Sequence, residues 1–158
     1  MRRIMALLLV SMPVALSPVL AQPVTEYTQT AFTIYNVCMN ARDTGSAQEA
    51  LDACTTVEES LASLRTMVPN ASAEETDYVV ALQGSVQLGI AAVALILDND
   101  IRTARVCDAT ERAWQTFADI TPGSPTMEGA TEVMQGTADN VRICRDAHGA
   151  PAWGRPLP

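Results

Sequence analysis

The sequence predicts an all-α fold of about five antiparallel helices, arranged as stacked helical hairpins or as a bundle, with two disulfides. Apolar residues recur at the i, i+3, i+4 spacing of a buried helix face through most of the chain. Clear capping and turn signals separate these segments. Four cysteines follow a leader that directs export, and cysteines of exported proteins usually pair.

The leader occupies residues 1–21. Arg2-Arg3 supplies its positive start, an apolar stretch follows, and Val19–Ala21 offers the residues that a signal peptidase reads. We therefore predict a signal peptide cut after Ala21, and a periplasmic or secreted protein. The rest divides into a single all-α domain over residues 22–148 and an irregular C-terminal tail over residues 149–158.

The predicted mature chain is strongly acidic. The leader removes two of the ten basic residues and none of the eighteen acidic ones, so its net charge is 8 − 18 = −10. Nucleic acids and anionic membranes attract concentrated positive charge, so neither is expected as a partner.

The apolar run Tyr78–Leu97 is long enough to span a bilayer. Gln83 and Gln87 lie one turn apart near its middle, and acidic residues flank both ends. We interpret the run as a central helix buried on nearly all sides, with a transmembrane helix as the alternative. No stable membrane insertion is expected once the leader is cleaved.

The helices are predicted from the capping, break and turn residues at their ends. The first covers Val24–Ala41; its β-branched and aromatic residues could also form a strand, but no partner strand is evident. Capping boxes at Ser46–Glu49 and Ser72–Glu75 begin the next two. The later breaks are Asp98–Asp100 and the turn Thr121–Pro125, after which the last helix runs to His148-Gly149. The apolar face of the fourth helix comprises Ile101, Ala104, Cys107, Trp114 and Phe117.

The cysteines Cys38, Cys54, Cys107 and Cys144 allow three connectivities. The pairs 38–54 and 107–144 are favoured, because each pair flanks the turn of an antiparallel hairpin. Redox and zinc sites are the alternatives, but both usually need shorter spacings such as C-x-x-C. We expect these four residues to be structural disulfides.

No residue is predicted to be catalytic, to bind a cofactor or to bind a metal. His148 is the only histidine, and its position suits a helix end, where a positive charge is favourable. Pairing of His148 with Met39 around a haem is an alternative without an attachment motif. The chain contains no Gly-rich phosphate loop, nucleophile elbow or His-based triad.

Residues 34–61 resemble a repeat unit of the tetratricopeptide class, as found in exported bacterial proteins. Such units pack two antiparallel helices through small residues around a Gly-containing turn. Cys38 takes the small position of the first helix, Gly45 the turn, and Ala50 with Cys54-Thr55 the inner face of the second. The resemblance implies helical hairpins and a protein-binding surface.

The function that these observations favour is a non-catalytic module in the periplasm that binds another envelope protein or a peptide. The alternative is an inhibitor or immunity-type protein that acts on an envelope enzyme. A small hydrolase or cofactor carrier ranks last, because no motif supports one.

Overall fold

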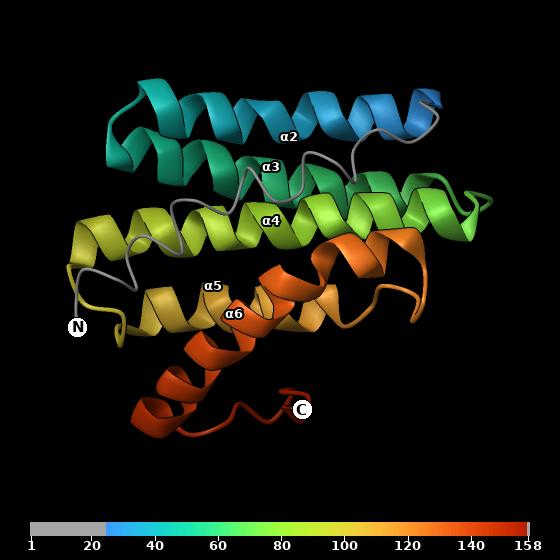
Figure 1. Cartoon of the computed structure of the whole chain (residues 1–158). Coiled ribbons are helices and arrows are strands. Elements are labelled where there is room, and N and C mark those ends of the chain that lie inside the picture. Colours follow the sequence, from blue (N-terminus) through green and yellow to red (C-terminus); the bar gives the residue numbers. More distant parts are fainter. Residues whose placement is uncertain (1–24, 158) are drawn as a thin grey trace.

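The computed structural model describes residues 25–157, which contain five helices and no strand (Figure 1). The helices are α2 (Glu26–Thr44), α3 (Ala47–Met67), α4 (Ala73–Asp98), α5 (Ala104–Phe117) and α6 (Pro125–His148). The predicted all-α class and the two disulfides are confirmed. The predicted signal peptide, residues 1–21, lies outside the described residues.

The five helices follow one another in antiparallel order around α4. Figure 1 shows α2, α3, α4 and α5 side by side, with α6 crossing α5 obliquely. α4 contacts all four other helices, with α2 and α3 on one side of it and α5 and α6 on the other (Figure 1). Connections of a few residues keep consecutive helices adjacent, as is usual for helical hairpins.

Local capping explains where these helices begin. The capping boxes of Ser46 and Ser72 are both present, with each serine oxygen accepting from a backbone N–H three residues on. Ser124 caps α6 and Pro125 follows at the first helical position. Asn99 ends α4 in the left-handed conformation, with φ of 52°.

Two predicted boundaries are wrong. α2 continues through Asp43 and Thr44, because its end is set by Gly45, whose N–H donates to the Ala41 carbonyl. Ile101 precedes α5 rather than contributing to its apolar face, because Thr103, whose side chain accepts from a backbone N–H inside the helix, is the N-cap.

The core consists mainly of two apolar clusters, one on each side of α4. The cluster between α4, α2 and α3 includes Tyr35, Leu61, Leu82 and Val86. The cluster between α4, α5 and α6 includes Leu88, Phe117, Ile120 and Val133. Because α4 belongs to both, it holds the two helical hairpins together.

Every residue of α4 from Asp77 to Ala94 is buried. Within the described part of the chain, α4 is the one helix long and apolar enough to cross a membrane, and 89% of its apolar window is buried inside the protein. Its two glutamines have partners on α3: Arg65 donates to Gln83 over 2.9 Å, and Gln87 donates to Glu58 over 2.8 Å. This burial supports the interpretation as a core helix.

Candidate functional site

The four predicted cysteine positions form the two predicted disulfides. Cys38–Cys54 joins α2 to α3 with a Cα–Cα distance of 4.4 Å, and Cys107–Cys144 joins α5 to α6 with a distance of 5.3 Å. None of the four thiols is free. The pairs are therefore structural links, and the second lies in the wall of a pocket.

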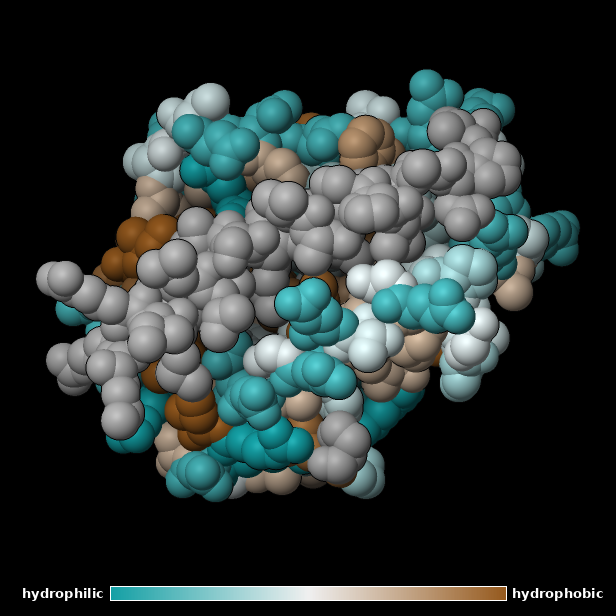
Figure 2. All heavy atoms as spheres, in the orientation of Figure 1, coloured by the Kyte–Doolittle hydropathy of each residue, from teal (hydrophilic) through white to brown (hydrophobic). Residues whose placement is uncertain are grey.

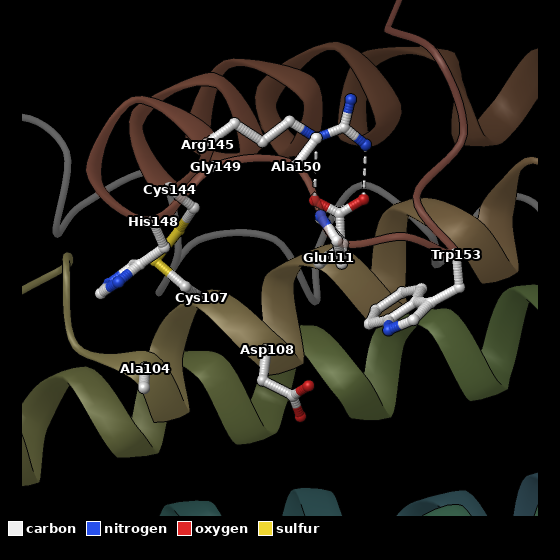
Figure 3. A pocket seen from close by; sticks show the side chains of 11 residues that line it. Ala104, Cys107, Asp108, Glu111, Cys144, Arg145, His148, Gly149, Ala150 and Trp153 are labelled. Atoms are coloured by element: carbon white, nitrogen blue, oxygen red, sulfur yellow. Dashed lines mark hydrogen bonds and ion pairs between the residues drawn. A yellow bond between two sulfur atoms is a disulfide. The ribbon is translucent and has the colours of Figure 1, made fainter.

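That pocket is a hollow of about 360 Å³ between α5, α6 and the start of the C-terminal tail (Figure 3). It is open to solvent. Its lining residues are Ala104, Cys107, Asp108, Glu111, Cys144, Arg145, His148, Gly149, Ala150, Pro151 and Trp153.

Helical spacing places these side chains together. The four contributions from α5 lie at positions i, i+3, i+4 and i+7, which is one face of a helix. Those from α6 lie within its last five residues. Gly149 then has φ of 80° and ψ of 162°, a conformation that is essentially restricted to glycine, and the chain turns back toward α5.

A buried ion pair spans the pocket beside the disulfide. Arg145 Nε donates to Glu111 Oε2 over 3.1 Å, and Arg145 Nη2 donates to Glu111 Oε1 over 2.6 Å. The side chains are only 16% and 5% exposed. In Figure 3 this pair and the Cys107–Cys144 bond form two cross-connections between the helices. Both fix the crossing of α6 over α5.

The tail is held against the helices at several points. Arg145 Nη2 also donates to the Arg155 carbonyl over 2.7 Å. Arg155 forms an ion pair with Asp119. Leu157 packs against the small cluster that contains Trp114 and Val141. The tail, predicted to be irregular, thus forms one wall of the pocket.

The rim of the pocket carries one large exposed aromatic side chain. Trp153 is 54% exposed, although the residues on either side of it belong to an anchored segment. Gly154 donates its N–H to the Pro151 carbonyl over 2.8 Å, which closes a turn around the tryptophan. The turn holds the indole at the mouth of the pocket.

The polar groups of the pocket are mostly paired within the protein. The carboxylate of Glu111 is neutralised by Arg145, and Asp108 lies 3.2 Å from Arg112 Nε. His148 Nε2 is within hydrogen-bonding distance of the Arg102 carbonyl, at the predicted helix end. Among the described residues, no group of three or more His, Cys, Asp or Glu side chains is placed to hold a metal ion. The pocket therefore offers apolar contact and shape more than reactive groups.

Sequence reasoning did not identify Glu111, Arg145 or Trp153 as site residues. A signal for Glu111 was present, because it lies four residues after Cys107 on the predicted buried face of the fourth helix. A carboxylate at such a position requires a partner. The identity of the partner and the position of Trp153 depend on the crossing of α5 and α6, which the local sequence does not encode.

The chain matches no protein-family model, and neither a curated protein nor a solved structure shows significant similarity to it.

Proposed function

We propose that this is an exported, non-catalytic binding module, and that the pocket between α5, α6 and the tail receives a segment of another envelope protein or a peptide. The observation that carries the proposal is the half-exposed Trp153 at the mouth of an open, mainly apolar pocket. Tryptophan is among the residues that most often dominate binding energy at protein interfaces.

The rigidity of the pocket supports binding. Its walls are linked by the Cys107–Cys144 disulfide and by the Glu111–Arg145 ion pair, so its shape is set before a partner arrives. A preformed site loses less conformational entropy on binding than a flexible one. The internal pairing of its charged groups favours recognition by shape and apolar contact over catalysis.

The proposed compartment rests on three features of the chain. The two disulfides are compatible with an oxidising, extracellular environment. The leader-like residues 1–21 and the acidic balance of the remaining chain fit export of a soluble protein.

Affinity capture with matched variants tests this function. The exported protein is immobilised and exposed to an envelope extract of the cells that make it, alongside Trp153→Ala and Ile96→Ala. Ile96 is a comparable exposed apolar residue, 66% exposed, at the end of α4. We expect a defined partner to bind the wild type and Ile96→Ala alike, and to bind Trp153→Ala at least about tenfold more weakly.

Two results would contradict the proposal: no partner enriched over an unrelated acidic protein, or equal capture by Trp153→Ala. Circular dichroism of each variant verifies that the helices remain folded. Recovery of a single enzyme whose activity falls on binding would establish the inhibitor form of this function, whereas recovery of assembly components would establish the adaptor form.

A further inference from the structure

We infer that the outer side of the α2–α3 hairpin is a second docking surface, which fits a basic amphipathic helix of a partner protein. It lies on helices that do not line the α5–α6 pocket, so it does not depend on the function proposed for that pocket. Three observations carry the inference: an apolar groove, its position away from α4, and its charge.

The groove is a hollow of about 410 Å³ between α2 and α3, lined by Ile34, Glu59, Ser60, Ser63, Leu64 and Met67. Ile34 and Leu64 are partly buried and pack against the core cluster beneath. Met67 is 71% exposed at one end of the groove. The floor of the groove is therefore a continuation of the hydrophobic core to the surface.

Exposed apolar residues continue along α2. Val37 is 54% exposed and follows Ile34 by three residues, so it lies on the same side of the helix one turn on. Single exposed apolar residues are normal on protein surfaces, whereas apolar residues that share one groove, as Ile34, Leu64 and Met67 do, indicate an interaction site. Figure 2 shows hydrophilic residues predominating along the outer edge formed by α2, with hydrophobic ones among them.

The groove faces away from the rest of the fold. Glu58 and Arg65 of α3 point toward α4, where each makes a hydrogen bond. Ser60 and Met67 follow them by two residues, which is about 200° further around a helix of 3.6 residues per turn. The groove residues thus lie on the side of the hairpin opposite α4. A helix placed there would extend the stacked arrangement by one member.

The negative charge of the hairpin indicates what kind of partner helix would bind to it. α2 and α3 carry two arginines and six acidic residues, a balance of 2 − 6 = −4. One of the six, Glu58, faces α4 and forms an ion pair with Arg112, so it does not add to the charge of the outer side. Glu59 lines the groove itself and makes no ion pair within the described residues. A helix with one apolar face flanked by lysine or arginine would match both features. A second copy of this acidic chain would be repelled.

A designed peptide pair provides the probe. One fluorescent peptide of about 18 residues, roughly five turns, carries a leucine stripe flanked by lysines, and a scrambled peptide has the same composition without the stripe. Fluorescence anisotropy against the exported protein should show saturable binding of the striped peptide and at least about fivefold weaker binding of the scrambled one. The difference measures recognition of the apolar face beyond charge attraction.

Matched variants locate the site. Glu59→Lys and Met67→Ser should each weaken binding of the striped peptide severalfold. Glu132→Lys, an identical charge change on the exposed side of α6, and Ile96→Ser should have little effect. Trp153→Ala should also bind the peptide normally, so that failure of this surface and failure of the α5–α6 pocket remain distinguishable.

Several results would overturn the inference. Equal loss with Glu59→Lys and Glu132→Lys would reduce the effect to overall charge. Equal binding of the two peptides would remove the role of the groove. If the protein forms a dimer in sedimentation experiments and Met67→Ser abolishes the dimer, the surface binds a second copy of this chain. Cosedimentation with anionic vesicles that Met67→Ser abolishes would assign it to a membrane.

Discussion

Gly84 of α4 shows how a single residue sets the distance between two helices. A Cβ at this position would lie 2.8 Å from Cε1 and Cζ of Phe117, a fully buried residue of α5. Gly89 differs, because a Cβ there would meet its nearest neighbour, a carbon of Arg42, at 3.5 Å. The two glycines of α4 therefore have different roles despite their similar burial.

Gly84→Ala should destabilise the protein by about 1 to 3 kcal/mol, because the added methyl group must displace the Phe117 ring in a packed core. Gly89→Ala is the matched control in the same helix. It should be neutral or stabilise by up to about 1 kcal/mol, because alanine restricts the unfolded chain. Urea unfolding measures both. Equal stability of the two variants would contradict the close approach at Gly84.

Two helix caps make stability depend on pH. The backbone N–H of Ser46 donates to Glu49 and that of Ser72 to Glu75, and these hydrogen bonds hold the pKa of each carboxyl below its ordinary value of 4.5. A lowered folded-state pKa stabilises the fold above the unfolded-state pKa, and this contribution is lost as the pH falls through the folded-state value. The caps should therefore weaken below about pH 4.5.

The double variant Glu49→Gln and Glu75→Gln tests this dependence, because glutamine can keep the capping hydrogen bond but does not titrate. Its thermal midpoint should fall less steeply than that of the wild type between about pH 5 and 3. A double glutamine variant at Glu59 and Glu132, which cap no helix, controls for the loss of two charges. Identical pH profiles of the capping variant and the wild type would show that the caps do not contribute.

Prediction at the residue scale succeeds where the determinants are local. The caps at Ser46, Ser72 and Ser124 were predictable, because a capping residue acts on backbone groups within one turn. The Glu111–Arg145 pair was not, because the two residues are 34 positions apart and meet only through the tertiary crossing of their helices. The sequence indicated only that the carboxylate of Glu111 lies on a buried helix face and needs a partner.

At the scale of elements, the two disulfides each join neighbouring helices. The Cys38–Cys54 pair is separated by 16 residues and the Cys107–Cys144 pair by 37. Removing each pair by substitution with alanine should cost about 3 and 4 kcal/mol respectively in the chain-entropy model. Urea unfolding of the two double variants measures the difference. Free thiols in the intact mass after alkylation without reductant would contradict the account of these cysteines.

The ion pair between α5 and α6 provides a second test at this scale. Arg145→Leu leaves the carboxylate of Glu111 buried without its partner and should cost about 3 to 5 kcal/mol. Arg105→Leu removes an arginine from an exposed pair with Asp98, spaced at 3.7 Å, and should cost at most about 1 kcal/mol.

The double variant Arg145→Leu with Glu111→Leu should recover most of the loss, because no unpaired charge then remains buried. Thermal and urea unfolding of all four proteins provide the comparison. If Arg145→Leu and the double variant are equally unstable, the loss comes from packing or from the lost hydrogen bond to the Arg155 carbonyl, and not from the unpaired carboxylate.

Helix order and pairing could be predicted from short turns and cysteine spacing, because both operate between sequence neighbours. The last residue of α2 and the first residue of α5 were predicted wrongly. Gly45 ends α2 and Thr103 caps α5, but neighbouring residues in the sequence are about equally suitable for these roles. The path of the tail after Gly149 depends on contacts with α5 and α6, so only its irregularity could be predicted.

At the scale of the whole molecule, α4 lies between two hairpins and its burial accounts for its apolar sequence. The oblique position of α6 opens the pocket, and nothing in the local sequence encodes that angle. The resemblance of residues 34–61 to a tetratricopeptide unit stays a prediction. Two surfaces of different character, the pocket at α5–α6 and the groove at α2–α3, are the places where partners are proposed to bind.

The most direct test of the central claim is cross-linking in the cells that export the protein. A photoreactive amino acid replaces Trp153 in one variant and Ile96 in another, and the cross-linked species are identified in the envelope fraction. We predict that position 153 cross-links to one defined envelope partner and that position 96 does not. The exported protein in these products should begin at Gln22. Identical cross-links at both positions, or a product that retains residues 1–21 in the cytoplasm, would contradict the account of an exported binding module.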